Sequence, residues 1–263
     1  MNINKSINFV DKNTFITGAA GNLGRLISKT FAELGSNLIL VDKSKNDLKK
    51  LEKELSIYQN IKIDTFPCNL QDEKDRKKLI KNFKKTYRLD ILINNAAFIG
   101  DSNLKGWNEE FSKQSISSWR NCLELNLITV FDLCQGLFQN LENTKNSKII
   151  NIASIYGHVA PDWSLYQGTD INNPSAYGSS KAGLIYLTKW LSTLSQKVRV
   201  NSISPGGIQR SQEKKFIGKY IKKTSLKRMA KEEDIMGTIV FLASDMSSYV
   251  TGQDIKIDGG FIK

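Results

Sequence analysis

Tyr177 and Lys181 are four residues apart, a spacing that places both side chains on one face of a helix, one turn apart. An ammonium beside a phenol favours the phenolate. It would lower the tyrosine pKa from about 10 toward a value that suits proton transfer near neutral pH. By itself this pattern is weak, because many such pairs lie solvated on helix surfaces. The pair predicts acid–base chemistry only if other groups join it.

Ser154 is the first such group, because it follows the apolar run 148–153, which reads as a buried strand. Open α/β sheets bind their ligands at the carboxyl ends of the strands, so a hydroxyl there is well placed to meet a substrate. The tyrosine and lysine lie in a predicted helix that begins at Pro174 and Ser175. We therefore expect Ser154, Tyr177 and Lys181 to meet at one edge of a sheet.

A glycine-rich turn lies near the amino terminus, between a predicted strand at 13–17 and a helical pattern that ends at Gly35. In this context glycines allow a tight turn and a close approach to a pyrophosphate, which the positive end of the helix attracts. The alternative is a plain tight turn. The residues expected to bind phosphate are Gly18, Gly21, Asn22, Leu23 and Gly24.

Asp42 ends the next predicted strand, 37–42, and lies 18 residues after Gly24. In dinucleotide-binding folds an acid near this position hydrogen-bonds the adenosine ribose and repels a 2′-phosphate. NAD is therefore favoured, with NADP as the alternative because Lys43 offsets part of the repulsion.

Composition narrows the function classes. The 263 residues, 40% of them hydrophobic, suit one large globular domain, and no apolar run has the length of a membrane span. The first residues resemble no signal peptide, so a cytoplasmic location is expected. Three scattered cysteines and a single histidine predict no disulfide framework, metal site or histidine triad.

The net charge of +12 comes from lysine clusters at 43–53, 74–85 and 214–231. Apolar residues interrupt each cluster at helical spacing, so we interpret the clusters mainly as solvated helix faces. Nucleic-acid binding is the minor alternative, and no binding motif accompanies the charge.

Predicted strands and helices alternate along the whole chain, without a linker or a repeat. This order predicts one doubly wound α/β domain with a mostly parallel sheet and helices on both faces. Asn126 lies among apolar residues of a long predicted helix, 117–141. Spacing alone leaves it as either a satisfied core residue or a site residue.

Taken together, these motifs resemble the single-domain branch of the short-chain dehydrogenase/reductase family, which implies a Rossmann-type dinucleotide-binding fold. The turn at 17–24 is similar to the family's cofactor loop, 94–97 to its Asn-Asn-Ala-Gly motif, and 205–206 to its nicotinamide-side turn. Asn126, Ser154, Tyr177 and Lys181 fall on its catalytic tetrad, and 251–260 is similar to its carboxyl-terminal signature. The resemblance covers nearly all of 1–263 and implies a sheet of about seven strands.

The resemblance implies an enzyme that interconverts a secondary alcohol and a ketone with NAD or NADP. Tyr177 would exchange the proton, Lys181 would also hold the nicotinamide ribose, Ser154 would hydrogen-bond the substrate oxygen, and Asn126 would anchor a relay water. The family is commonly homotetrameric, so a homo-oligomer is expected. Further residues implied to bind the cofactor are Asn69, Leu70, Asn95, Ala96, Pro205, Gly206 and Ile208.

Several positions depart from the family pattern. Asn22 replaces a common glycine, Asn69 replaces an aspartate, and Arg210 replaces a threonine. Ser154 and Tyr177 are 23 residues apart, more than is usual, and 161–169 fills the gap. This insertion is similar to that of members found in bacterial surface-glycan pathways, which implies a role in carbohydrate metabolism.

The substrate side is expected to combine the insertion with a lid near 206–230, the family's mobile segment. Arg210 would bind an anionic group of a small polar, sugar-like substrate, and Trp163 and Tyr166 would offer flat faces to a sugar ring. The alternative is that the lid's basic residues only face solvent. Competing functions are a 3-oxoacyl-carrier-protein reductase and, in another class, a non-catalytic NAD-sensing or scaffold protein.

Overall fold

The computed structural model describes residues 6–84, 88–98 and 104–263. Within these residues seven strands form one sheet in the order β3-β2-β1-β4-β5-β6-β7, and every neighbouring pair is parallel. The prediction of a doubly wound parallel sheet is confirmed, with a wholly parallel sheet rather than a mostly parallel one. The strands are β1 (Asn13–Thr17), β2 (Asn37–Asp42), β3 (Ile63–Pro67), β4 (Ile91–Asn94), β5 (Ser147–Ile152), β6 (Val198–Pro205) and β7 (Asp254–Ile257).

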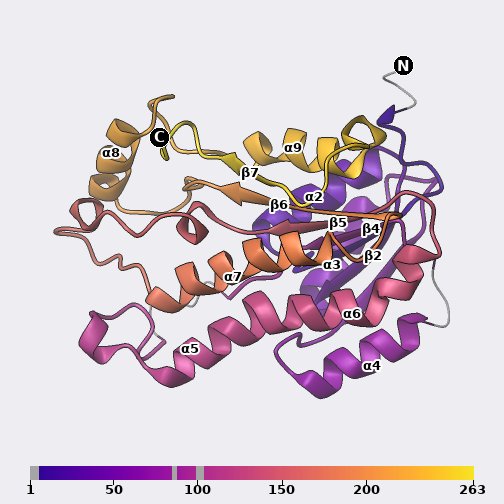
Figure 1. The fold of residues 1–263 in the computed structure, drawn as a ribbon, viewed down its shortest axis with the longest axis horizontal. Coiled ribbons are helices and arrows are strands. Elements are labelled where there is room, and N and C mark those ends of the chain that lie inside the picture. The colour runs from indigo at the N-terminus through magenta and orange to yellow at the C-terminus, as the bar shows by residue number, and fades with distance from the viewer. Residues whose placement is uncertain (1–5, 85–87, 99–103) are drawn as a thin grey trace.

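Helices cover both faces of the sheet. Figure 1 shows α4, α6 and α7 on one side and α2 and α9 on the other. The helices are α2 (Asn22–Glu33), α3 (Lys45–Leu55), α4 (Glu73–Lys84), α5 (Ile116–Leu123), α6 (Thr129–Glu142), α7 (Ser175–Leu191), α8 (Lys214–Lys223) and α9 (Glu233–Ala243). No helix in the described ranges has the length and apolarity needed to cross a bilayer.

Alternation along the strands produces two cores. Phe15, Ile39 and Val41 point to the layer of α4, α6 and α7, whereas Ile16 and Leu40 point to the layer of α2, α3 and α9. Because both faces are covered, the central strands β4, β5 and β6 are buried along their whole length. The strand order reverses between β1 and β4, which opens a crevice at the carboxyl ends of the strands.

The long helix expected over 117–141 is interrupted. A π-helical turn, η2 (Glu124–Ile128), separates α5 from α6 and carries Asn126. The side-chain pattern of this stretch is continuous, so periodicity alone does not reveal the turn. Such turns often occur at functional sites because they re-aim one side chain within a helix.

The insertion between Ser154 and α7 packs against α8. Its short 3₁₀ turn η4 (Trp163–Leu165) lies next to α8, where Lys219 Nζ donates to the carbonyls of Ser164 (2.8 Å) and Gln167 (2.7 Å). Lys223 forms an ion pair with Asp162. These contacts join the insertion and α8 into one structural unit, which we call the insertion–lid unit (residues 158–173 and 214–223).

Candidate active site

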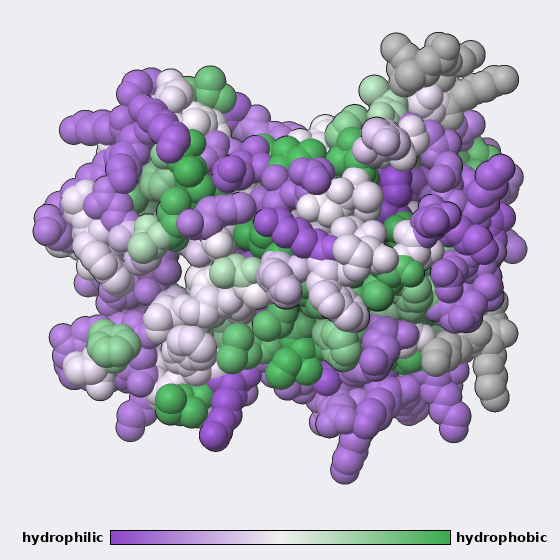
Figure 2. Space-filling view, in the orientation of Figure 1, coloured by the Kyte–Doolittle hydropathy of each residue, from purple (hydrophilic) through white to green (hydrophobic). Residues whose placement is uncertain are grey.

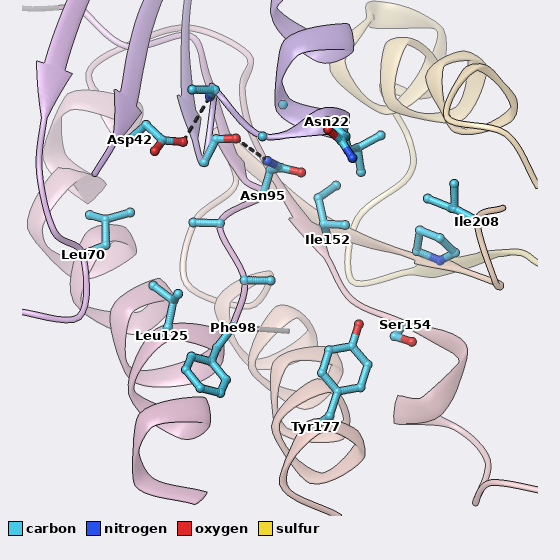
Figure 3. Close-up of a pocket in the computed structure, with 18 of the residues that line it drawn as sticks. Asn22, Asp42, Leu70, Asn95, Phe98, Leu125, Ile152, Ser154, Tyr177 and Ile208 are labelled. Carbon is cyan, nitrogen blue, oxygen red and sulfur yellow. Dashed lines mark hydrogen bonds between the residues drawn. The ribbon is translucent and has the colours of Figure 1, made fainter. Parts of the chain in front are cut away.

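A cavity of about 850 Å³ runs along the carboxyl edge of the sheet. Figure 3 shows Asp42 and Leu70 at one end of it and Ser154 and Tyr177 at the other. Parallel strands bring these residues together, because β2, β3 and β5 all end at this edge. The cavity therefore unites the two halves of the site predicted from sequence.

Ser154 and Tyr177 meet at one end of the cavity. Ser154 directly follows the buried segment at the end of β5, is itself 6% exposed, and its Oγ accepts a hydrogen bond from the Tyr156 backbone N–H at 3.2 Å. Tyr177 lies in the first turn of α7, with its hydroxyl directed into the cavity beside Ser154 (Figure 3). Burial raises the pKa of Tyr177, and the nearby Ser154 side chain opposes part of this rise.

Lys181 is buried beneath the tyrosine. Its Nζ donates to the Ile152 carbonyl at 2.7 Å and lies 5.7 Å from the centre of the Tyr177 ring. Burial lowers the pKa of this lysine to about 8. That Lys181 lowers the tyrosine pKa stays a prediction. The groups that oppose the effect of burial on the pKa of Tyr177 are Ser154 and the Arg210 guanidinium.

Asn126 lies behind the cavity wall. Its Oδ1 accepts from the Phe98 N–H at 2.6 Å, and its Nδ2 lies 3.0 Å from Ser180 Oγ and 3.3 Å from the Phe98 carbonyl. Ser180 Oγ in turn donates to the Tyr177 carbonyl at 2.7 Å. The asparagine thus fixes the segment after β4 against the helix that carries Tyr177.

The glycine turn provides the space that a pyrophosphate needs. Gly18 has a positive φ of 61°, and a Cβ at Gly24 would lie 2.0 Å from the Gly18 carbonyl oxygen. Asn95 Nδ2 braces the turn through the carbonyls of Thr17 (2.9 Å) and Gly18 (3.1 Å). The first N–H groups of α2 have no partner within the helix, so they can bind an anion.

Two carboxylates lie at the far end of the cavity. Asp42 accepts hydrogen bonds from the N–H groups of Ala20 (3.1 Å) and Ser44 (3.2 Å), which hold it half-buried on the wall. Asp47, which the sequence reasoning missed, also lines this end, and its hydrogen bond with Ser44 lowers its pKa. Lys43 lines the cavity as well but is exposed to solvent.

All of the remaining residues expected to bind a cofactor line the same cavity. These are Gly21, Asn22, Leu23, Asn69, Leu70, Ala96, Pro205, Gly206 and Ile208. Their positions fit an elongated dinucleotide with its adenosine near Asp42 and its nicotinamide near Tyr177.

The three residues predicted to bind substrate lie in three different places. Arg210 lines the main cavity, where its Nε donates to Glu232 Oε1 at 2.9 Å. Trp163 instead lines a second cavity of about 670 Å³. Tyr166 is 7% exposed and belongs to an apolar cluster with Phe216, so its ring faces protein rather than the main cavity.

Tyr156 lines the main cavity, whereas Tyr166 does not. It lines both cavities, and its hydroxyl lies 2.5 Å from that of Tyr166, which also accepts from Asn173 Nδ2 at 3.0 Å. The insertion therefore reaches the site indirectly, by anchoring Tyr156. The only sequence signal for this role is that Tyr156 lies two residues after Ser154.

Comparisons with known proteins agree with this geometry. The family profile described as "Enoyl-(Acyl carrier protein) reductase" matches residues 18–262. The chain is 34% identical over 254 residues to 3-oxoacyl-[acyl-carrier-protein] reductase FabG of Thermotoga maritima, covering 94% of this chain and 96% of the relative. It is 29% identical over 255 residues to post-translational flagellin modification protein A of Campylobacter coli, covering 95% of this chain and 98% of the relative.

A solved structure has the same fold. The short-chain dehydrogenase of Leptospira borgpetersenii with bound NAD⁺ superposes with a TM-score of 0.82 at 30% identity, covering 99% of this chain and 96% of the other. Both the profile match and the relatives span nearly the whole chain. The chain belongs to the short-chain dehydrogenase/reductase family of NAD(P)-dependent oxidoreductases.

Proposed function

We propose that this chain interconverts a secondary alcohol and a ketone on a polar, sugar-like substrate that carries an anionic group. The observation that carries the proposal is the meeting of Ser154 and Tyr177 at one end of a cavity whose other end has the features of a dinucleotide site. A nicotinamide held between these ends supplies or accepts the hydride. The chain's own residues bind and orient the substrate and exchange its proton.

Each member of the tetrad has a distinct role. Tyr177 exchanges the proton with the substrate oxygen, while Ser154 donates a hydrogen bond to that oxygen and stabilises its developing charge. Lys181, with a pKa of about 8, holds the nicotinamide ribose while it is protonated. Asn126 holds the segment after β4 against the helix that carries Tyr177, and it anchors a water of the proton relay.

NAD is the proposed cofactor. Asp42 places a carboxylate where a 2′-phosphate would lie, and Asp47, whose carboxylate pairs with Lys50, forms part of the same cavity wall. The exposed Lys43 is screened by solvent and offsets little of this repulsion. NADP remains the alternative cofactor.

Arg210 supports the anionic character of the substrate. Its side chain lines the same cavity as Tyr177, so an oxyanion bound to it would lie close to the reacting atoms. Glu232 fixes its Nε, and the planar fork retains donors for a ligand. The insertion resembles that of surface-glycan enzymes, and a relative named for post-translational flagellin modification supports a substrate other than an acyl carrier.

A second candidate is reduction of a 3-oxoacyl group on an acyl carrier protein. The FabG relative carries that name, and α8 presents the exposed residues Lys214, Lys215, Lys222 and Lys223 to an acidic partner. The same exposure is what a solvated outer lid face predicts, so it does not by itself favour a carrier. The departures at Arg210 and in the insertion favour the sugar-like substrate.

The chain is proposed to act as one domain with a lid near 206–230, as a cytoplasmic homo-oligomer. Large apolar side chains remain exposed on η2, α6 and α7, among them Ile128, Phe131, Tyr186 and Trp190. Figure 2 shows apolar side chains gathered along α6, between more polar regions. Such a patch fits burial against a second copy.

The test is a substrate screen that follows NADH absorbance over sugar ketones, sugar phosphates, nucleotide sugars and acyl-carrier ketones. We expect turnover with an anionic sugar derivative, and Tyr177→Phe should abolish it while NADH still binds. Turnover confined to acyl-carrier ketones would establish the second candidate. A Tyr177→Phe enzyme that retains more than a tenth of the wild-type kcat would exclude the assigned proton donor.

A further inference from the structure

Arg76 differs from the lysines around it on α4. Its side chain is 2% exposed, whereas the neighbouring lysines of this helix face solvent. Its Nε donates to Asp132 Oδ2 at 2.8 Å, and its Nη1 lies 2.7 Å from Glu124 Oε1. These partners belong to α6 and to the π-helical turn η2, so one guanidinium links three segments.

The electrostatics of this cluster depend on arginine. One cation faces two carboxylates in a partly dehydrated site, and removing it would leave both acids without their counterion. The guanidinium also supplies several donors in a fixed plane, which an ammonium does not reproduce. The arginine therefore both neutralises the two carboxylates and fixes the directions of the hydrogen bonds between the three segments.

A third bond extends the cluster to the cavity. Arg76 Nη1 donates to the Leu70 carbonyl at 2.7 Å, and Thr129 Oγ1 donates to the same oxygen at 2.8 Å. Leu70 lies in the connection between β3 and α4, and its side chain lines the Asp42 end of the cavity (Figure 3). The position of this wall is therefore set by two side chains that do not touch the cavity.

We propose that Arg76 is a positioning residue for the cofactor, which holds the Leu70 wall of the adenosine site and ties it to the turn that carries Asn126. The inference rests on the proposed dinucleotide site and adds a residue outside it. Arg76 acts through Leu70, so it should affect the adenosine half of the cofactor and leave the nicotinamide half alone.

Binding measured without substrate tests this separation. Kd is measured by fluorescence titration for NADH and for reduced nicotinamide mononucleotide, which lacks the adenosine half. Arg76→Lys should weaken NADH binding five- to tenfold and leave mononucleotide binding within twofold of wild type. Thr129→Val, which removes the second bond to Leu70, should weaken NADH binding two- to fivefold.

Arg199 offers a matched control. It is also buried, but it bonds the carbonyls of Val250, Leu242 and Ser244 near the amino end of β6, away from the cavity. Arg199→Lys should lower Tm without changing either Kd more than twofold. The control separates loss of stability from loss of position.

Two results would overturn the inference. One is NADH binding within twofold of wild type in both Arg76→Lys and Thr129→Val. The other is an equal loss of NADH and mononucleotide binding, which would indicate general loosening. A wild-type protein that binds NADH no better than the mononucleotide would refute the dinucleotide site itself, and that failure appears before any variant is made.

Discussion

Replacing Asp42 by alanine should weaken NADH binding and reduce the discrimination against NADPH. The carboxylate is held by the Ala20 and Ser44 N–H groups, so it reaches the ribose hydroxyls without a conformational cost. Hydrogen bonds to a charged acceptor contribute about 1.5–3 kcal/mol, which corresponds to a roughly 10- to 150-fold rise in the Kd for NADH. NADPH should lose less, because the variant also removes repulsion of its 2′-phosphate.

The assay is fluorescence titration of NADH and NADPH with wild type, Asp42→Ala and Lys43→Ala. The ratio of the two Kd values should favour NADH in wild type and approach unity in Asp42→Ala, stopping short of it because Asp47 remains at the same end of the cavity. Lys43→Ala should change the ratio less than twofold, since that side chain is exposed. Two results would refute this reasoning. Tighter binding of NADPH than of NADH by wild type would show that the positive charge at this end outweighs the carboxylates. An unchanged ratio of the two Kd values in Asp42→Ala would show that Asp42 does not set the cofactor preference.

Three further changes probe the other end of the site. Because burial lowers the pKa of Lys181 to about 8, its charge is present below that pH and lost above it. The wild-type Kd for NADH should therefore rise from pH 7 to pH 9, while Lys181→Met should bind NADH weakly at both. Parallel pH profiles of the two proteins would contradict the role. The KM for an anionic substrate should rise with ionic strength, and it should rise about tenfold in Arg210→Ala. A KM that is insensitive to salt and unchanged in Arg210→Ala would show that Arg210 is only a solvated lid residue. Tyr166→Phe keeps the buried ring but removes the hydroxyl that holds Tyr156. Steady-state kinetics should show a severalfold higher substrate KM, with the Kd for NADH unchanged. An unchanged KM would show that the bond between the two hydroxyls is purely structural.

The relation of sequence to structure differs among the elements. The strand–turn–helix at 13–35 and the buried strand before Ser154 were predicted correctly, because buried parallel strands are short apolar runs and glycine turns have few alternatives. The position of Tyr177 on α7 was also predictable from the start signal at Pro174 and Ser175. In each case the controlling interactions are local in the chain.

Other features depend on contacts between distant segments. The lysine cluster at 74–85 was interpreted mainly as a solvated helix face, and its lysines at 74–81 are exposed; Arg76 among them is buried because α6 and η2 bring Asp132 and Glu124 to it. The helical spacing placed Lys181 beside Tyr177, but only the packed structure shows that its ammonium also bonds the Ile152 carbonyl at the end of β5.

The insertion gives the clearest contrast. Its aromatic residues predicted a binding surface, and Tyr166 is instead buried against Phe216 of α8, where it anchors Tyr156. The sequence by itself determined the fold, the reaction family and which residue types gather at the carboxyl edge of the sheet, because repeated local patterns encode them. Only the tertiary structure decided which of those side chains face the cavity, because burial and charge pairing depend on segments that meet across the fold.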